Sequence, residues 1–566
     1  MQPFDLTAAI AVAAEVRSRL PGRVEQVLQP DRFTLCLLLR TLTGKQGLSL
    51  SWHPQAARFG WSGLPPRRPD TFSFRQQVGH QVQGLALVTV GLAAPWERVL
   101  RFDFAERPGD VPRWYLHLEI VGQYSNAVLV NAEGVVVAAA RQVGDRQSRL
   151  RSVQTGDPYQ LPPPRLAASP HLDEPMAVWR DRLTVLGLPL LKATLAAYRG
   201  VSTALVQGML ARAELPPQAV PSTLTAADWH RWFGVWQQWV AAVTTEAIAL
   251  QETPSGYGLV WDGWGESASA LVTRYYETRL QREADARLVQ HLRQTVQGHL
   301  AKLQRKAEGF CDRLVRSETA DGLQAEADLL MAHLGGGAPG LREIALPDFG
   351  TGEPQTLALD PTLTVLQNAQ ARYRQAQKLR RSRETLNRLL TEVMAEIAYL
   401  EQVAVDLALG EDDPEVWPEL EAELIEQGYL TVPARPKVKP KATLDCRRYT
   451  SPGGWEIWVG RNNRQNDLLW RSAQPWDIWL HAQEIPGSHV LLRLSPQTVP
   501  DRLDLQHAAN LAAYYSRARL SDRVPVVWVK PQHLFKPKGA KPGMVAYRHE
   551  EILWGEPAAV RAEPLC

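Results

Sequence analysis

Residues 477–493, DIWLHAQEIPGSHVLLR, place two histidines, a Pro-Gly turn and a serine between two apolar runs. Three kinds of chemistry use such residues: a serine nucleophile with a histidine base, a metal ion held by imidazoles, or a turn that offers polar groups to a phosphate or a base. The residues concerned are His481, Pro486, Gly487, Ser488 and His489.

The sequence disfavours the serine nucleophile and the metal ion. Adjacent residues of an extended chain point to opposite faces, so His489 is badly placed to act as the base for Ser488, and no G-x-S-x-G elbow is present. Zinc needs at least three protein ligands, and the four cysteines stand far apart without a CxxC pair. We therefore expect no catalytic residue, no metal site and no cofactor.

Polar and basic stretches near this turn favour contact with RNA instead. GRNNRQND (460–467) offers arginines and amide side chains that can hydrogen-bond base edges and sugar hydroxyls. FKPKGAKPGM (535–544) adds three lysines in a Gly/Pro loop that cannot be helical. Besides the turn itself, the residues expected to contact RNA are Arg461, Asn462, Asn463, Arg464, Gln465, Asn466, Lys536, Lys538 and Lys541.

Charge is distributed unevenly along the chain. The net charge of the 566 residues is only +3, which by itself implies no nucleic-acid partner. Residues 435–548, however, carry 19 Lys and Arg against 8 Asp and Glu, and residues 411–426 carry eight acids and no base. Such asymmetry is typical of a region that faces a polyanion, although a basic domain that is merely solvated would have the same composition.

The length and the patterning predict a multidomain α+β protein. In the segment expected to be helical, Gly200 can end one helix and Ser202 can cap the next. This pattern is typical of a helix-hairpin-helix that offers backbone N–H groups to a phosphate, or of a hairpin used only for packing. The predicted segments are a mixed β-rich domain (1–170), a helical domain (171–265), a coiled-coil hairpin (266–410), an acidic and then Pro/Lys-rich linker (411–443) and an α+β domain (444–566).

The coiled-coil hairpin is predicted to be antiparallel, with a small structure at its tip. Apolar residues recur every three or four positions from Val289 to Leu314 and from Leu386 to Leu407, on either side of a Gly-rich segment. Basic residues crowd the distal ends of both arms, where like charges repel unless an anion is present. We therefore expect phosphate contacts there, with a solvated charged face as the alternative. The residues expected to make these phosphate contacts are Arg380, Arg381 and Arg383.

The sequence gives no sign of a membrane span or a signal peptide. No apolar run approaches the 18 residues that a span needs, and the apolar run 8–14 follows Asp5 without a basic region before it. The cysteine usage fits a reducing compartment. We therefore expect a cytoplasmic protein.

Four segments of the C-terminal region resemble the RNA-binding domain of the NFACT family, which comprises bacterial RqcH, long described as fibronectin-binding protein A, and eukaryotic NEMF. They are VGRNNRQNDLLW, DIWLHAQEIPGSHVLLR, AANLAAYYSRAR and KPKGAKPGMVAY. Phe4-Asp5, LPGRVEQVLQP (20–30), EIVGQYSNAVL (119–129) and GDPYQLPP (156–163) are similar to the family's first domain. LDPTLTVLQNAQARYRQAQK (359–378) is similar to the start of its second coiled-coil arm.

The resemblance implies a ribosome-associated quality-control factor rather than an enzyme. Members bind the large ribosomal subunit that still holds a stalled peptidyl-tRNA, and they recruit tRNA, charged with alanine in bacteria. They thereby promote template-free alanine tailing, which marks the nascent chain for degradation, while peptide bonds form in the ribosome. The partners implied are the large subunit, rRNA, tRNA-Ala and the stalled peptidyl-tRNA, with no membrane and no DNA.

The resemblance also implies a set of tRNA-contacting residues in the first domain. The family carries an Asp-Arg pair on a strand there, and Glu97-Arg98 stands at that point in this chain, with one added methylene. A surface ion pair is the alternative for these two residues. The full set is Asp5, Glu97, Arg98, Glu119, Gly122, Ser125 and Asn126.

Two other functions stay open at this point. The family's first two domains are similar to formamidopyrimidine-type DNA glycosylases, but those enzymes use an N-terminal proline as nucleophile, and Pro3 lies behind Gln2 here. They also commonly use a zinc finger, for which this sequence has no cysteine pattern. A fibronectin-binding adhesin is the second possibility, and it is disfavoured by the lack of a recognisable signal peptide or anchor.

Overall fold

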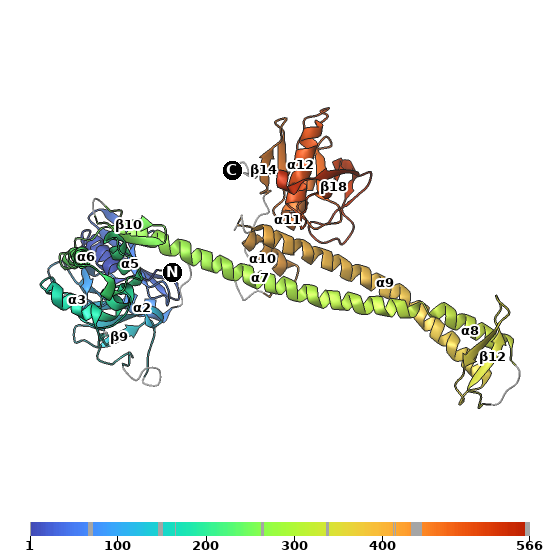
Figure 1. Cartoon of the computed structure of the whole chain (residues 1–566), viewed down its shortest axis with the longest axis horizontal. Helices are drawn as coiled ribbons and strands as arrows, with labels where there is room; N and C mark the ends of the chain where they lie inside the picture. Colours follow the sequence, from blue (N-terminus) through green and yellow to red (C-terminus); the bar gives the residue numbers. More distant parts are fainter. Residues whose placement is uncertain are drawn as a thin grey trace. The chain divides into compact units, whose positions relative to one another are not determined.

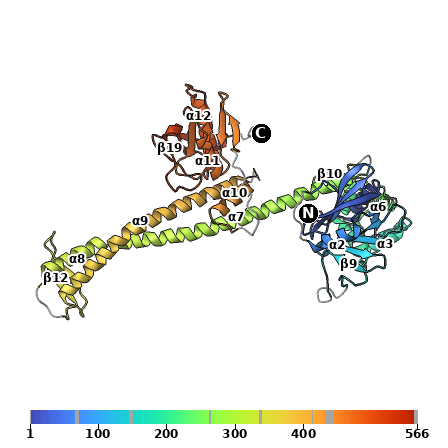
Figure 2. The same ribbon diagram turned by 180° about the vertical axis from the view of Figure 1, so that it is seen from behind.

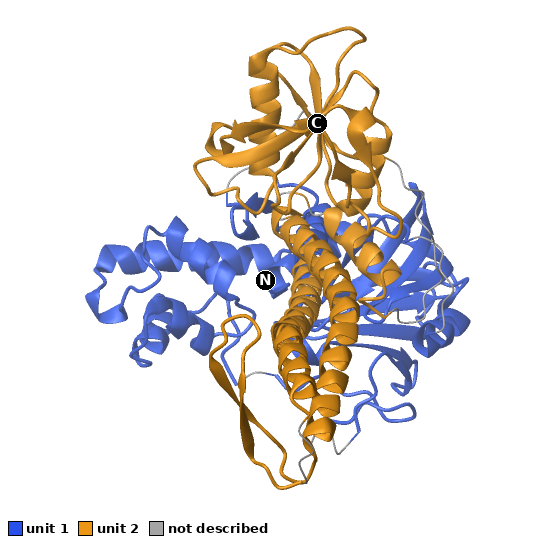
Figure 3. Ribbon diagram, turned by 90° about the vertical axis from the view of Figure 1, so that its right-hand side faces the viewer, with its two compact units in different colours: residues 1–283 blue, residues 284–566 orange. Residues whose placement is uncertain are grey.

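The chain forms two compact units, residues 1–283 and 284–566, and the long helix α7 (Ala268–Ser317) contributes to both. Figures 1 and 2 show the chain from two sides, and Figure 3 colours the two units. The finer division at residues 170, 265, 410 and 443 remains a prediction. The computed structural model describes residues 2–65, 72–144, 151–164, 166–261, 265–334, 339–410, 413, 415–431 and 444–560.

The first unit contains a nine-stranded antiparallel sheet in the order β4-β3-β2-β1-β5-β6-β7-β8-β9. Consecutive strands are neighbours except where β5 returns beside β1, and β8 and β9 form an antiparallel hairpin. The strands are β1 (Gly22–Asp31), β2 (Thr34–Thr41), β3 (Gly44–Ser51), β4 (Arg58–Ser62), β5 (Ala86–Leu92), β6 (Val99–Ala105), β7 (Trp114–Glu119), β8 (Asn126–Asn131) and β9 (Val136–Ala139).

Helix α1 (Leu6–Arg17) packs in the core of this unit. It is rich in alanine and buried on most sides, as its apolar run predicts. Phe59 makes edge-to-face contacts with Phe4 and Phe102, at ring-centroid distances of 5.7 and 5.5 Å. A second helix, α2 (Ser73–Val82), packs against β1 and β9.

The predicted helical segment forms four helices around a core of tryptophans. Trp179, Trp232, Trp236 and Trp239 are among the largest fully buried side chains of the described residues. Gly200, at φ +80°, and Ser202, which caps the second helix of the pair, form the turn that the sequence predicts. The helices are α3 (Met176–Thr184), α4 (Leu190–Ala197), α5 (Thr203–Arg212) and α6 (Ala226–Thr244), and the hairpin β10 (Leu250–Thr253) and β11 (Gly256–Leu259) leads to α7.

The second unit begins with the antiparallel helical hairpin. Val289 and Val296 of α7 pack in one cluster with Leu400 and Leu407 of α9 (Val365–Leu409), as the apolar periodicity predicts. The hairpin β12 (Glu343–Pro347) and β13 (Pro354–Ala358) forms the tip. The helix α8 (Ala320–Ala332), which was not predicted as a separate helix, packs against α9 and this tip hairpin (Figure 2).

The acidic segment that was expected to be a linker contains a helix, α10 (Val416–Glu426). Its apolar residues Val416, Trp417, Leu420 and Leu424 pack on α7 and α9, and one of its acids, Glu423, is buried on the same side. The Pro/Lys-rich part of the expected linker, residues 432–443, lies outside the described residues.

The C-terminal domain is a six-stranded antiparallel sheet in the order β14-β15-β17-β16-β18-β21. Helix α12 (Arg502–Tyr514) packs on one face, and helix α11 (Asn463–Arg471) packs on the other with the short strands β19 (Leu534–Phe535) and β20 (Ala546–Tyr547). The sheet strands are β14 (Arg447–Thr450), β15 (Glu456–Val459), β16 (Ile478–Ala482), β17 (Val490–Leu492), β18 (Val524–Val529) and β21 (Glu551–Gly555).

None of the helices in the described ranges is both long enough and apolar enough to cross a membrane.

Two carboxyl groups are buried beside each other where α9 meets α10. Asp406 Oδ1 accepts a hydrogen bond from Gln402 Nε2 at 2.8 Å, and Glu423 Oε1 accepts one from the Tyr399 hydroxyl at 2.8 Å. The other oxygen of each carboxyl group has no hydrogen-bond partner among the described residues. Burial and the neighbouring Glu423 carboxyl raise the pKa of Asp406 well above its usual range.

We expect Asp406→Asn to stabilise the second unit more at pH 8 than at pH 5. A raised pKa means that the folded chain binds more protons than the unfolded chain, so stability falls as the pH rises above the ordinary carboxyl range, and an amide removes that loss. A gain of about 1 kcal/mol would raise the unfolding midpoint by roughly 2–4 °C. Calorimetry of this variant and of Asp522→Asn, at an exposed position, measures the effect. A larger gain at pH 5 would contradict it.

Candidate nucleic-acid interfaces

A cleft of about 620 Å³ lies in the first unit. Asp5, Glu97, Arg98 and Gly122, which the sequence predicts to contact tRNA, line it together with the Gly200–Ser202 turn between α4 and α5. Residues from four separate parts of the first unit therefore converge on one hollow.

Asp5 links two helix starts at the base of this cleft. Its Oδ1 accepts a hydrogen bond from the backbone N–H of Ala8 at 3.0 Å and caps α1, and its Oδ2 accepts one from the Ser202 hydroxyl. Ser202 Oγ in turn accepts from the N–H of Leu205 at 3.1 Å and caps α5. Burial raises the pKa of Asp5, while these hydrogen bonds and the charge of Arg98 oppose the shift. Asp5 therefore positions the cleft walls.

Glu97 and Arg98 lie in the turn that precedes β6, not on a strand as was expected. Glu97 Oε1 accepts a hydrogen bond from Arg199 Nη1 at 3.2 Å, and the two side chains are 22% and 27% exposed. Arg199 stands immediately before Gly200, so this ion pair joins the β5–β6 connection to the helical pair. Sequence reasoning missed Arg199, although its place next to the predicted turn was a usable signal.

Three other residues predicted to contact tRNA are buried. Glu119 is paired with Arg151 and accepts from the Tyr159 hydroxyl at 2.9 Å. The Ser125 hydroxyl donates to the carbonyl of Gly122 at 2.7 Å. These contacts shape the exposed loop that carries Gly122, at φ +58°. Asn126 donates to the carbonyl of Arg141 at 2.9 Å and accepts from its N–H. Direct contact of tRNA with these three side chains stays a prediction.

In the C-terminal domain, residues 461–466, which are predicted to contact RNA, lie against α10 and the acids beside it. The Arg461 guanidinium is paired with Asp413 at 2.5 Å and with Asp445, and Arg464 is paired with Glu426. Because both cations already have carboxylate partners, phosphate would have to displace those carboxylates.

The amide side chains of the same segment are also engaged within the protein. Asn462 caps α11 through the N–H of Gln465 and donates to Glu419, and Asn463 donates to Glu423 at 3.0 Å. Gln465 accepts from the N–H of Asp445, and Asn466 accepts from the N–H of His489. These amides stabilise the end of the sheet and its contact with α10.

The histidines of the Pro-Gly stretch lie together, with ring centroids 5.4 Å apart. Burial lowers the pKa of His481 and lowers that of His489 further, so both imidazoles are neutral near pH 7 and carry no charge for a phosphate. The Gly487 N–H donates to Gln402 of α9 at 2.5 Å, and the Pro486 carbonyl accepts from the N–H of Arg517. The Ser488 hydroxyl is buried and has no hydrogen-bond partner among the described residues.

The lysines of the Gly/Pro loop differ in their surroundings. Lys536 is paired with Asp467. Lys541 donates to Gln427 at 3.2 Å and lies over the rings of Tyr399 and Tyr429. Lys538 is exposed.

At the far end of the helical hairpin, acids of α8 face the basic residues of α9. Arg380 is paired with Asp321 at 2.7 Å, and Arg372 with Glu326 at 2.8 Å. These pairs offset part of the like-charge repulsion on which the phosphate prediction depends. Arg381 and Arg383 are exposed.

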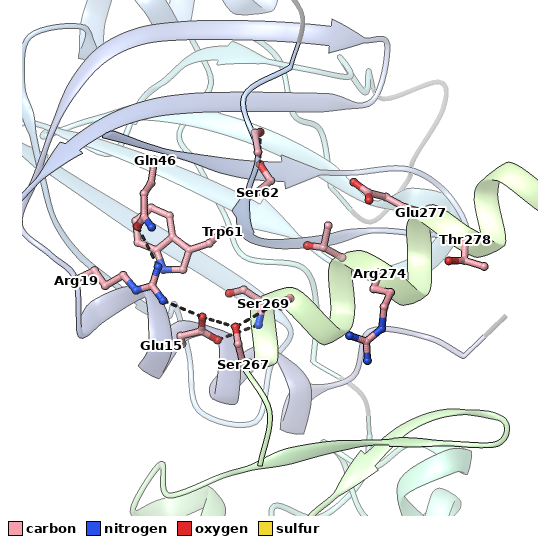
Figure 4. Close-up of a pocket in the computed structure, with 13 residues that line it drawn as sticks. Glu15, Arg19, Gln46, Trp61, Ser62, Ser267, Ser269, Arg274, Glu277 and Thr278 are labelled. Atoms are coloured by element: carbon pink, nitrogen blue, oxygen red, sulfur yellow. Dashed lines mark hydrogen bonds and ion pairs between the residues drawn. The ribbon is translucent and has the colours of Figure 1, made fainter. Parts of the chain in front are cut away.

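A second hollow, of about 530 Å³, lies between α1, β4 and the start of α7 (Figure 4). Glu15 Oε1 accepts from the Ser267 hydroxyl at 2.8 Å, and its Oε2 accepts from the N–H of Ser269 at 2.9 Å. Glu15 therefore supplies the negative charge that a helix N-terminus favours. We attribute the hollow to the docking of α7 on the first unit.

The chain is similar to known proteins over nearly its whole length. A family model described as NFACT N-terminal and middle domains matches residues 5–443, and one described as NFACT protein RNA binding domain matches residues 446–549. A Streptococcus suis protein named Rqc2 homolog RqcH is 28% identical over 564 residues, covering 96% of each chain. The Bacillus subtilis protein of that name is 29% identical over 578 residues, covering 98% of each.

A solved structure covers part of the chain. The structure of the C-terminal part of the Streptococcus suis fibronectin/fibrinogen-binding protein is 31% identical in sequence, with a TM-score of 0.39. It covers 48% of this chain and 95% of that one.

We expect Gly200→Ala to destabilise the first unit by about 1–3 kcal/mol. The backbone lies at φ +80°, and an added Cβ would meet Leu6 Cδ2 and Trp96 Cε3 at 2.9 Å. Gly208→Ala, within α5 and with nothing near its Cβ, is the matched control and should be neutral or stabilising. Thermal unfolding followed by circular dichroism compares the two. A Gly200→Ala midpoint at or above that of the wild type would refute the steric argument.

Proposed function

Because the chain belongs to the NFACT family, we propose that it is a ribosome quality-control factor that binds large subunits holding a stalled peptidyl-tRNA. In this proposal it recruits tRNA, charged with alanine, and promotes template-free tailing of the nascent chain. The observation that carries the proposal is the match to Rqc2 homolog RqcH proteins over 96–98% of the chain. It acts in the cytoplasm as an RNA-binding factor, and the ribosome forms the peptide bonds.

The tRNA would bind at the cleft of the first unit. Arg98 offers a planar set of N–H donors suited to a phosphate or a base edge. Glu97, held by Arg199, offers carboxylate oxygens that can accept from an exocyclic amine. The Gly200–Ser202 turn brings backbone close to the same hollow. Support for this placement comes from the convergence of these groups in one cleft.

The second unit would hold the ribosomal particle. The exposed Arg381 and Arg383 lie on α9 next to Arg380, which pairs with Asp321 at the start of α8. A helix of 45 residues extends about 68 Å at 1.5 Å per residue, a length suited to reaching across a large particle. The domain that matches the RNA-binding model lies on the same unit as this arm.

We expect Arg98→Ala to reduce tRNA recovery at least tenfold while large-subunit binding is retained, because other parts of the chain supply the ribosome contacts. Sequencing of RNA that co-purifies with the tagged protein from cells measures both quantities. Arg107→Ala, an exposed arginine of the same domain, is the control and should recover tRNA like the wild type. Equal tRNA recovery with Arg98→Ala would remove the cleft from the proposal. Recovery of DNA without rRNA from the wild type would overturn the function itself.

The double change Arg381→Glu and Arg383→Glu should weaken association with large subunits and reduce its salt dependence. Each lost phosphate contact lowers the slope of log K against log salt by about 0.7–0.9. Glutamate is also a good helix former, so helicity should be unchanged. Sedimentation with purified subunits at several salt concentrations tests this, with Arg388→Glu as a control nearer the middle of α9. Unchanged sedimentation would mean that these two residues are merely solvated.

A further inference from the structure

The contacts of α10 raise the question of which surface of the C-terminal domain meets RNA. The Arg461 guanidinium is paired with Asp413, between α9 and α10, and Arg464 is paired with Glu426 of α10. His489 is buried and His481 partly buried, and both are neutral near pH 7. The residues first expected to bind RNA therefore lie mostly at an internal contact. An RNA-binding domain needs accessible cations and aromatic groups elsewhere.

Such groups gather at the β14–β15 edge of the sheet, on the face that α11 covers. Trp458 of β15 is directly opposite Arg448 of β14 and Leu491 of β17. Arg493 is two residues beyond Leu491 and so extends from the same face. We call this region the Trp458 surface; it comprises Arg448, Trp458, Trp470, Arg471, Trp476 and Arg493.

Two guanidinium groups lie against the indole of Trp458. The Arg448 Cζ is 5.0 Å and the Arg493 Cζ is 4.5 Å from the ring centroid. Arg448 lies in β14, and Arg493 directly follows β17, on the other side of β15. Arg448 is exposed, while the indole is half-buried. The indole thus supports an accessible guanidinium plane.

Arg493 connects this indole to the end of α11. Its Nη1 donates to the Ser472 carbonyl at 3.3 Å, and its Nε lies 3.4 Å from Asp477 Oδ2. In the adjoining residues, Arg471 lies 5.9 Å from the ring of Trp470 and is exposed, and Trp476 is 37% exposed. Arg493 therefore connects the Trp458 ring to the segment that holds Trp470, Arg471 and Trp476.

We propose that the Trp458 surface binds unpaired bases of RNA. A base can stack on the guanidinium plane of Arg448 or on the exposed ring of Trp476, while Arg448 and Arg471 neutralise adjoining phosphates. Stacking of this kind requires a free base face, which a duplex covers. Glu456, which accepts from the indole N–H of Trp458 at 2.8 Å, disfavours phosphate at that point and can accept from a base amine or a 2′-hydroxyl. The inference rests on the proposed function and names the RNA-contacting surface within it.

Every residue of the Trp458 surface lies inside residues 446–549, which match the RNA-binding family model. This match selects RNA as the occupant over a protein partner. The surface also lies on the sheet face opposite α12, so exposed arginines near α12 serve as matched controls.

The test measures binding of the full chain to a labelled 12-nucleotide single-stranded RNA and to a 12-base-pair duplex by fluorescence anisotropy. We expect the wild type to prefer the single strand. The double change Arg448→Ser and Arg471→Ser should weaken single-strand binding about tenfold or more. Arg502→Ser with Arg523→Ser removes the same charge from the region of α12 and should leave single-strand binding unchanged. Both double variants change exposed side chains, and circular dichroism checks that they fold.

Three results would overturn the inference: unchanged binding by the Arg448/Arg471 variant, equal loss in the control variant, or equal affinity of the wild type for single strand and duplex. Tighter RNA binding by Glu419→Gln with Glu426→Gln, together with an unaffected Arg448/Arg471 variant, would assign RNA to the groups that α10 covers instead. Sedimentation of the wild type with large subunits distinguishes failure of the proposed function from failure of the inference about the Trp458 surface. Its failure rejects the proposed function, whereas normal sedimentation with any of these anisotropy results rejects the inference alone.

Discussion

A single buried carboxylate, that of Asp5, holds together the part of the molecule on which the proposed tRNA contact depends. It is hydrogen-bonded both to the start of α1 and to the residue that caps α5, so the sheet-packed helix and the helical pair share one carboxyl group. The close approach of Gly200 to Leu6 and Trp96 brings the two elements into direct contact. With these contacts in place, Arg98 and the Gly200–Ser202 turn face one cleft instead of two separate surfaces.

The second unit satisfies its charges in a different way. The acidic residues of α10 stand opposite arginines and amides of the RNA-binding domain, and the apolar side of α10 is attached to the helical hairpin. The Arg464–Glu426 pair is partly exposed and contributes little net stability, whereas the buried hydrogen bond from Asn463 to Glu423 would be lost in any other registration of the partners. The network therefore specifies how the domain docks on the helices within this unit.

Features set by local periodicity were predictable from the sequence. The apolar repeat that begins at Val289 predicts the helical hairpin, and Gly200 predicts the turn between α4 and α5. Both patterns can be read because the residues that form them lie within a few positions of each other. The helix α10 had a readable signal in Val416, Leu420 and Leu424, four residues apart, yet its acidic composition led to the prediction of a linker.

The ion-pair and hydrogen-bond partners of the candidate site residues could not be predicted from neighbouring residues in the sequence. Arg461 pairs with Asp413, 48 residues away in the sequence, and Glu97 pairs with Arg199, 102 residues away. No spacing rule connects such positions before the fold is known. The cap formed by Asn462 was readable as the start of a helix, but the same amides also suit RNA, and composition alone does not separate the two uses.

The ion pair between Glu97 and Arg199 has a consequence for how this cleft can change over evolution. The additional methylene of Glu97 lets its carboxylate lie 3.2 Å from a guanidinium on the other wall, so shortening it to aspartate withdraws the acceptor and leaves a partly buried arginine without that partner. Positions 97 and 199 are thus constrained jointly, and a substitution at one is tolerated best when the other is substituted as well. Covariation between them, more than the identity of either residue, is the signature that descent should leave at this cleft.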